Sequence, residues 1–377
     1  MTGLLAFAVG DYAHGASFVI QAAGMQGPAR AIAEWTTDEL AETNTRITWR
    51  GGSLRGRVYQ PSSGGQLKPA STLDAPPSLL VPGVHAEGID EPRLIQFARD
   101  VASMGRVVVA VELPDLKNYR ITTRSTDMIE DAALWLSNGP YAVDGRVGLM
   151  GISFAGGLSI AAGSRPSLHS RIAFGMSFGG HGDLPRTLQY LCTGRLPDGR
   201  LFPPHDYGVA IILLGVADRI VPAAQVQPLR ESILAFLHAS HVDLRDKTQG
   251  QVEFTRAAAL AESLSEPSRT LMNYVNTRDV ASLGPILLPH VSDMGGDDAL
   301  SPGHWTPTFP VYLLHGSGDN VIPAAESQRL AETFRARGVD VTQLTTPLIT
   351  HAEVDRSAAV LAVWDLVRFW ADLLDED

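Results

Sequence analysis

One serine stands in a sequence context that is typical of a catalytic nucleophile. Ser153 lies in GISFAG, residues 151–156, between the apolar run RVGLM and a stretch that favours a helix. Small residues around it allow the sharp strand-to-helix turn that holds a serine clear of a sheet. The usual G-x-S-x-G pattern ends in glycine, and Ala155, which is also small, takes that place here. The alternative interpretation is a serine that caps a helix.

Two further residues could complete the chemistry. Asp319 follows the apolar run PVYLLHG and His351 follows the run VDVTQL, so each is predicted on a loop at the end of a strand. A serine hydroxyl attacks only when a neutral imidazole takes its proton, and a carboxylate must orient that imidazole and offset its developing charge. His351 and Asp319 can supply both groups. The alternatives are an ordinary turn aspartate and an ordinary loop histidine.

A second aspartate competes for the role of the acid. The segment ILLGVADRIVP, residues 212–222, echoes LLHGSGDNVIP, residues 313–323, and so aligns Asp218 with Asp319. However, the first segment continues into a predicted helix, and no strand followed by a histidine comes after it at similar spacing. We therefore prefer Asp319, because functional groups of α/β sheets collect on loops at the carboxyl ends of strands.

The order serine, aspartate, histidine, with each residue after a strand, resembles the α/β-hydrolase superfamily. The resemblance covers the chain from about Arg46 to the C-terminus, apart from a long insertion. It implies eight strands, with the nucleophile after the fifth, the acid after the seventh and the histidine after the eighth. The sequence looks similar to the dienelactone-hydrolase-like and esterase branch. Its serine nucleophile argues against dehalogenases and epoxide hydrolases, which use an aspartate.

The oxyanion of an acyl-transfer reaction needs two N–H donors that are in place before the charge develops. We expect the backbone of Phe154 to be one donor. The resemblance implies that the loop VPGVHAEG, residues 81–88, provides the second donor through the backbone of Val84. Pro82 departs from the family pattern, which has a histidine at that place.

Two histidines are candidates for the substrate pocket. His85, in the same loop, is either a substrate contact or a polar loop residue. His181 lies in the glycine-rich segment SFGGHGDLPR, which predicts either a pocket wall or simply the end of a strand.

The order of elements predicts a mostly parallel, doubly wound α/β sheet, because apolar runs of strand length alternate with helical periodicity. RITW and LRGRVY, joined by a Gly-Gly turn, predict an antiparallel hairpin before this alternation. The alternation stops after Phe178 and resumes at Pro310, and so long an interval requires a fold of its own. We expect an N-terminal helical segment packed on the core or cap over 1–45, a first part of the core over 46–178, a helical cap over 179–303 and a second part of the core over 304–377.

The predicted cap contains amphipathic stretches over residues 223–239 and 251–276. An insertion at this place emerges at the carboxyl ends of the strands, so its apolar faces are expected to roof the site and line the pocket. The alternative is that these faces pack on a partner subunit and form a homo-oligomer.

Composition limits the partners and the location. The chain of 377 residues has a formal net charge of −11, which argues against nucleic acid and anionic membrane surfaces as partners. Cys192 is the only cysteine, so no intrachain disulfide can form, and a reducing, cytoplasmic location is expected. The alternative is a secreted protein without disulfides. The first 24 residues are apolar but interrupted by Asp11 and His14, which predicts an amphipathic helix instead of a signal peptide or a membrane span. We expect this helix to pack on the protein, and the alternative is that it lies on a membrane surface.

Together these features predict a serine hydrolase that cleaves a small carboxylic ester through an acyl-enzyme intermediate, with no metal and no cofactor. A thioesterase, an acyltransferase or a peptidase could use the same three residues, because they fix acyl chemistry but not the leaving group. A non-catalytic ligand-binding protein on the same fold is the alternative from a different class.

Overall fold

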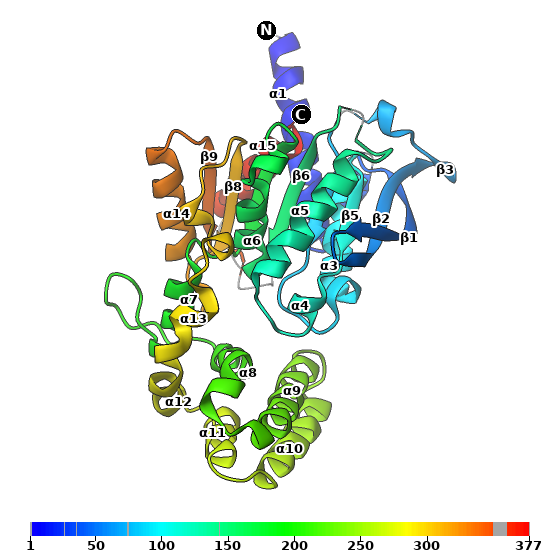
Figure 1. Ribbon diagram of the computed structural model, residues 1–377. Coiled ribbons are helices and arrows are strands. Elements are labelled where there is room, and N and C mark those ends of the chain that lie inside the picture. The colour runs from blue at the N-terminus through cyan, green and yellow to red at the C-terminus, as the bar shows by residue number, and fades with distance from the viewer. Residues whose placement is uncertain are drawn as a thin grey trace. The chain divides into compact units, whose positions relative to one another are not determined.

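The computed structural model describes residues 2–25, 27–34, 36–73, 75–142, 144–349 and 360–376. The chain divides into two compact units, which can be followed by colour in Figure 1. Unit 1 consists of Met1–Asn118, Thr123–Gly182 and Asp298–Asp377, and unit 2 consists of Tyr119–Thr122 and Asp183–Asp297. Unit 1 contains the sheet, whereas the named elements of unit 2 are helices.

Unit 1 is built on a mixed sheet with the strand order β1-β2-β5-β4-β6-β7-β8-β9 and with β3 beside β2. Pairing is antiparallel from β1 to β5 and parallel from β5 to β9. This arrangement confirms the predicted mostly parallel, doubly wound sheet, and the two-residue β3 is additional to the eight expected strands. The strands are β1 (Glu39–Trp49), β2 (Gly52–Ser63), β3 (Gln66–Leu67), β4 (Ser78–Val81), β5 (Val108–Val111), β6 (Val147–Ile152), β7 (Ile172–Phe178), β8 (Val311–Gly316) and β9 (Val341–Thr346).

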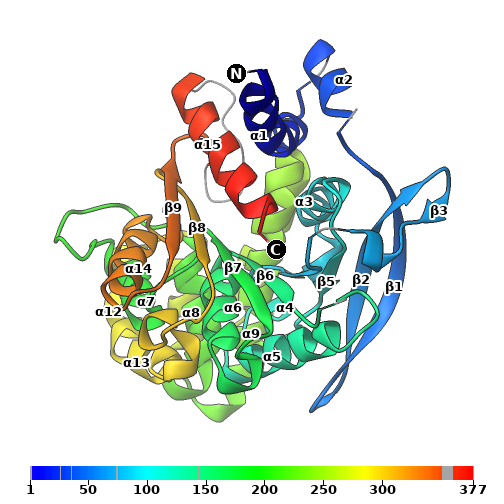
Figure 2. The same ribbon diagram turned by 90° about the horizontal axis from the view of Figure 1, so that it is seen from above.

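Helices cover both faces of this sheet, because each parallel connection needs a crossover. One face carries α1 (Thr2–Ala22), α3 (Pro92–Ser103) and α15 (Val360–Leu374), and the other carries α5 (Thr123–Ser137), α6 (Phe154–Gly163) and α14 (Ala325–Ala336), as Figure 2 shows. The remaining elements of unit 1 are short, namely α2 (Pro28–Glu34), α4 (Pro114–Lys117), η1 (Ala70–Thr72), η2 (Gly88–Asp90), η3 (Pro166–Leu168), η5 (Asp298–Leu300) and η6 (Pro302–His304).

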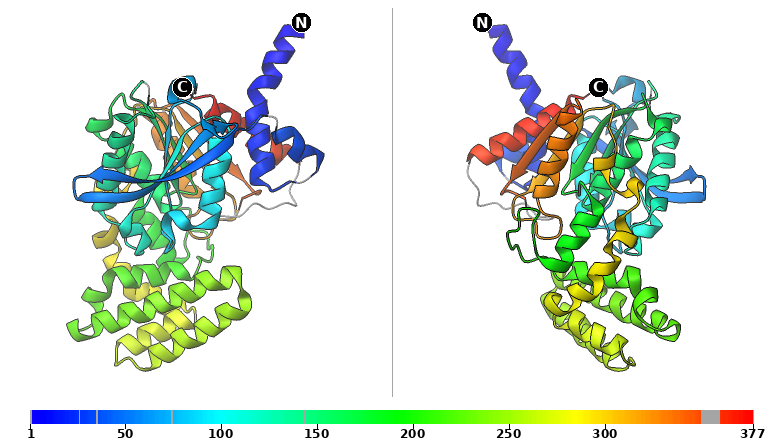
Figure 3. Two further views of the ribbon diagram at one scale, coloured as in Figure 1. Left: turned by 90° about the vertical axis from the view of Figure 1, so that its right-hand side faces the viewer. Right: turned by 60° about the vertical axis from the view of Figure 1, so that its left-hand side comes forward.

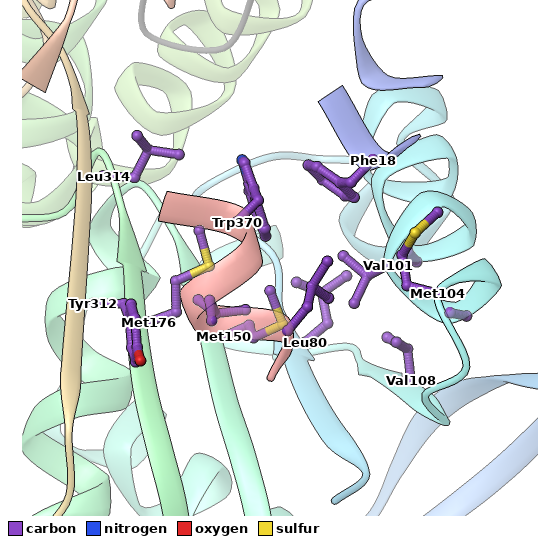
Figure 4. Packing of buried hydrophobic residues seen from close by; sticks show 14 of the residues in the cluster. Phe18, Leu80, Val101, Met104, Val108, Met150, Met176, Tyr312, Leu314 and Trp370 are labelled. Carbon is purple, nitrogen blue, oxygen red and sulfur yellow. The ribbon is translucent and has the colours of Figure 1, made fainter. Parts of the chain in front are cut away.

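A hydrophobic cluster fills the space between the sheet and the helices α1, α3 and α15. Four-residue strands such as β4 and β5 are buried along their whole length, which explains why the sequence shows them as continuous apolar runs. Side chains of the six strands β2, β4, β5, β6, β7 and β8 meet those of the three helices there. Figure 4 shows Leu80, Val108, Met150, Met176, Leu314, Val101, Met104, Phe18 and Trp370 among them. This core fixes the strands whose carboxyl ends carry the candidate site.

Within unit 1, helix α1 of the N-terminal segment packs against α15. The rings of Phe18 in α1 and Trp370 in α15 lie 3.9 Å apart between centroids, and a Cβ on Gly15 would stand 2.4 Å from the carbonyl oxygen of Val367. The predicted helical segment over 1–45 is too long, because β1 begins at Glu39 and pairs with β2 from there. Among the described helices, none combines the length and the apolar character needed to span a membrane.

The described part of unit 2 is helical, as Figure 3 shows for its antiparallel pair α9 and α10. The predicted amphipathic stretch over 251–276 is not one helix. It is divided into α10, which ends at Glu262, and α11, which begins at Ser268. The helices are α7 (Leu184–Thr193), α8 (Tyr207–Ile220), α9 (Ala223–Arg245), α10 (Lys247–Glu262), α11 (Ser268–Asn276), α12 (Val280–Leu287), η4 (Leu288–His290) and α13 (Val291–Gly295).

Candidate active site

Ser153 occupies the turn between β6 and α6 in a conformation that serine rarely adopts. Its backbone angles are φ 55° and ψ −133°, and its side chain is buried within the structure at 8% exposure. The N–H of Ser153 donates to the carbonyl oxygen of Phe178 at 2.7 Å, and its own carbonyl accepts from the N–H of Gly156 at 2.8 Å. Such backbone strain costs of the order of 1–3 kcal/mol and is concentrated at functional sites.

Two glycines make this turn sterically possible. A Cβ on Gly151 would stand 2.3 Å from the carbonyl oxygen of Ala155, and a Cβ on Gly156 would stand 2.3 Å from the Oγ of Ser177. Neither position therefore accepts a side chain. Ala155 is completely buried, so its methyl group is accommodated where the usual pattern has glycine.

Asp319 lies in the loop that leaves the carboxyl end of β8. Its side chain is 1% exposed, and its Oδ1 accepts hydrogen bonds from the N–H groups of Val321 at 2.9 Å and Ile322 at 3.0 Å. Charge-assisted bonds of this kind offset the cost of burying a carboxylate. Oδ2 points toward the backbone of Gly179, where a Cβ would stand 3.5 Å away.

The sheet order brings the loops of Ser153 and Asp319 together. Ser153 follows β6, Gly179 follows β7 and Asp319 follows β8, and these three strands are parallel neighbours. The N–H of Gly179 donates to the carbonyl oxygen of Leu314 at 2.8 Å, so the end of β7 is joined to both flanking strands. The serine and the carboxylate therefore emerge at the same edge, as the arrangement of parallel strands requires.

The loop after β4 approaches the serine from the other side. A Cβ on Gly83 would stand 3.1 Å from the Cβ of Ser153, which places the backbone of this loop directly beside the serine. Val84 is the next residue and is 9% exposed. Phe154 is the first residue of α6, where an N–H has no acceptor within the helix. The two predicted N–H donors thus lie in the segments that border Ser153.

The two candidate pocket histidines have different surroundings. His85 is partly buried, and its Nδ1 accepts from the N–H of Glu87 at 3.2 Å. His181 is completely buried inside unit 1, with its Nε2 2.7 Å from the carbonyl oxygen of Leu300. Its ring also packs on the ring of Phe154, with 5.7 Å between the centroids. These contacts are those of a packed core histidine. His181 lies against Phe154, the residue that follows Ser153, and contributes to the packing of the turn.

The remaining predicted residues are placed as follows. His351 lies outside the described residues. Asp218 lies within α8, where 57% of its side chain is exposed and Oδ1 is 3.2 Å from an Nη2 of Arg230. It is therefore a surface residue of a helix, and it does not follow a strand.

Sequence reasoning missed two buried partners of the Asp319 loop. His315, in β8, places Nε2 2.7 Å from the carbonyl oxygen of Ile322 and 3.4 Å from Oδ2 of Asp319. Its Nδ1 lies 2.6 Å from the Oγ of Ser327 in α14. The only signal in the sequence is a histidine inside an otherwise apolar strand, and that signal cannot show which groups the ring meets.

The described residues also limit other kinds of chemistry. No group of three or more His, Cys, Asp or Glu side chains in the described ranges is arranged to hold a metal ion. Burial raises the pKa of Cys192 to about 12, so its thiol is not an activated nucleophile at neutral pH.

The strand order, the strained turn after β6 and the loop after β8 define the α/β-hydrolase fold. Among solved structures, the chain is similar to a mutant of the esterase rPPE, with 13% identity, a TM-score of 0.52 and 96% of each chain covered. It is also similar to a thermostable esterase from Pseudomonas putida, with 15% identity, a TM-score of 0.51 and 96% of each chain covered. At these identities the likeness establishes the fold. The sequence matches no protein-family model and no curated protein.

Proposed function

We propose that this protein is a serine hydrolase that cleaves carboxylic esters through an acyl-enzyme intermediate. The observation that carries the proposal is the strained backbone of Ser153, held at the end of β6 by glycines that leave no room for side chains. A serine that only capped a helix would need no such strain, since capping residues adopt ordinary extended angles. The two similar structures are esterases, which favours an ester as the substrate.

In the proposed mechanism, the Oγ of Ser153 attacks the ester carbonyl carbon while His351 takes the hydroxyl proton. The carbonyl oxygen becomes an oxyanion that accepts hydrogen bonds from the N–H groups of Phe154 and Val84. When the tetrahedral intermediate collapses, the C–O bond to the alcohol breaks and His351 returns the proton to the leaving oxygen. Water then attacks the acyl-enzyme by the same steps, which releases the acid and restores Ser153.

Asp319 would orient His351 and stabilise its imidazolium form. Oδ1 accepts hydrogen bonds from the N–H groups of Val321 and Ile322, and in the proposed mechanism Oδ2 accepts one from a ring N–H of His351. The carboxylate is buried, and an electrostatic interaction with a histidine is stronger there than in water. No step of this mechanism uses a metal or a cofactor.

We further propose that unit 2 acts as a cap that sets the preference for the acyl or alcohol group. The support is its place in the chain, directly after β7, because insertions there emerge at the carboxyl ends of the strands. The substrate is proposed to be a small molecule, and the single, buried cysteine favours a cytoplasmic location.

A fluorophosphonate probe tests the function, because it reacts with an activated serine and leaves a binding protein unlabelled. We expect the wild-type protein to be labelled and Ser153→Ala to resist labelling and to lose at least about 10³-fold in kcat. Esters of p-nitrophenol from C2 to C16 would then rank the acyl chains. An unlabelled wild-type protein, or a Ser153→Ala variant that keeps more than about a tenth of the activity, contradicts the proposal.

A further inference from the structure

The buried histidine of β8 lies behind the proposed acid and is not part of the proposed triad. His315 is completely buried, as is Ser327 in α14, and Asp319 is 1% exposed. The imidazole therefore connects β8, the loop that carries the carboxylate, and the first turn of α14. Burying a polar imidazole costs free energy unless both ring nitrogens have hydrogen-bond partners.

The partners of the ring determine where its proton lies. Nε2 faces the carbonyl oxygen of Ile322 at 2.7 Å and Oδ2 of Asp319 at 3.4 Å, and both are acceptors. This nitrogen must therefore carry a hydrogen. Nδ1 faces the hydroxyl of Ser327 at 2.6 Å, which can donate to it. When the ring carries a single proton, these contacts place it on Nε2, which is the nitrogen near the carboxylate.

The loop of Asp319 is held from two sides by this arrangement. Ile322 donates its N–H to Oδ1 of Asp319, and its carbonyl oxygen accepts from Nε2 of His315. The aspartate and the histidine are therefore coupled through the same residue as well as directly. Any rotation of the carboxylate about its bond to Cβ would change its distance to Nε2.

We propose that His315 is a positioning residue, which with Ser327 fixes the orientation of the Asp319 carboxylate toward His351. The inference rests on the proposed function, because it gives Asp319 the role of the acid. Nε2 of His315 donates to the carbonyl oxygen of Ile322 and lies 3.4 Å from Oδ2, so the ring restricts the positions that this oxygen can occupy when it receives an N–H from another group. His315 touches neither substrate nor reacting atoms, and it acts only through Asp319.

Kinetics of two substitutions separate this role from a purely structural one. His315→Leu keeps the approximate size but removes the donor, and it should lower kcat by about 10- to 100-fold while KM changes by less than about threefold. His315→Gln can place an amide N–H near the position of Nε2 and should recover most of the lost kcat. Ser327→Ala removes only the hydroxyl that fixes the tautomer, so its smaller loss, about 3- to 10-fold, tests the inference with less risk to folding.

A matched control and a double substitution complete the experiment. Ser125→Ala deletes an equally buried hydroxyl in α5 of the same unit and should leave kcat and KM unchanged. In the Asp319→Asn background, His315→Leu should cause no further loss, because a residue that acts through the carboxylate has nothing left to position. Melting temperatures of all variants, measured alongside, report folding.

The outcomes distinguish this inference from the proposed function. Wild-type protein that neither hydrolyses p-nitrophenyl esters nor reacts with the fluorophosphonate would overturn both. Active wild-type protein, with a folded His315→Leu or Ser327→Ala variant of unchanged kcat, would overturn the inference alone. The inference is also overturned if His315→Leu and Asp319→Asn reduce kcat independently, so that their effects multiply.

Discussion

A Cβ on Gly83 would stand 3.1 Å from the Cβ of Ser153 and 3.2 Å from the carbonyl oxygen of Ile152. Both distances are shorter than ordinary van der Waals contacts, so a side chain at residue 83 would push the loop after β4 or the turn aside by a few tenths of an ångström. The position of the next N–H, that of Val84, depends on this close approach. The relationship links the proposed oxyanion donor to the proposed nucleophile.

Gly83→Ala is expected to lower kcat by about 10- to 100-fold, because displacing the loop moves a donor away from the developing oxyanion. Gly318→Ala is the matched control, since a Cβ there meets no described atom within 4 Å. Initial rates on a p-nitrophenyl ester and thermal melts of both variants check the prediction. Equal rates for the two variants would argue against a role for this loop in the reaction.

The strain at Ser153 should be visible in stability. Both Ser153→Gly and Ser153→Ala are expected to be inactive. The free energy of unfolding of Ser153→Gly should exceed that of Ser153→Ala by about 1 kcal/mol, because glycine adopts a φ of 55° without strain. Ser164 has an ordinary φ of −81°, so there the glycine variant should be the less stable one. Urea unfolding of the four variants measures both differences. If the alanine variant is the more stable one at both positions, Ser153 is unstrained in solution.

The choice between the two aspartates can be tested directly. Asp319→Asn should lose about 10²- to 10⁴-fold in kcat, because an amide cannot balance the charge of an imidazolium. Asp218→Asn should keep the wild-type rate, because its carboxylate is exposed on α8 beside Arg230. Steady-state kinetics of both variants decide the matter, and a reversed result would assign the acid to Asp218.

Stability should depend on pH through Asp100 in α3. Burial raises the pKa of Asp100 to about 6, although a hydrogen bond from Gln96 at 2.8 Å opposes this shift. Between pH 4 and pH 6 the unfolded carboxyl ionises while the folded one stays protonated, so the free energy of unfolding falls as the pH rises through this range. The fall amounts to at most about 3 kcal/mol.

Asp100→Asn should remove this part of the pH dependence. We expect the variant to gain stability relative to the wild type between pH 4 and pH 7, as urea unfolding at a series of pH values would show. A difference between the two proteins that stays constant over the whole range would mean that Asp100 ionises in the folded protein at its ordinary pKa.

The design of a cap experiment also changes with the structure. Alanine substitution of Leu213, Leu214 or Leu271 is therefore not a direct test of the pocket. These side chains are 0%, 6% and 3% exposed and lie in helices of unit 2. Their loss is expected to create cavities that cost about 2–5 kcal/mol each, so a changed ester profile would report unfolding of unit 2 instead of specificity.

Much of unit 1 could be predicted from the sequence because its signals are local. Buried parallel strands leave continuous apolar runs, and the turn at Ser153 needs small residues at fixed places, so both can be recognised in a few residues. The position of Asp319 after a strand was predictable for the same reason. The start of β1 at Glu39 was not, because Glu39–Thr45 are mostly polar, partly exposed residues that become a strand only through pairing with β2.

The contacts that tune the candidate site were decided by tertiary structure. Nothing local in the sequence shows that Gly83 contacts Ser153, because the two residues are far apart along the chain. The contacts of His315 with Ser327 and Asp319 join a strand, a loop and a helix, so they depend on how these elements pack. The echoed segments 212–222 and 313–323 give the clearest case. One forms helix α8 and the other forms strand β8 with its loop. Short apolar runs are compatible with both states. The segment 313–323 becomes a strand because it lies between β7 and β9, which both pair with β8, whereas the segment 212–222 has no such neighbours in α8.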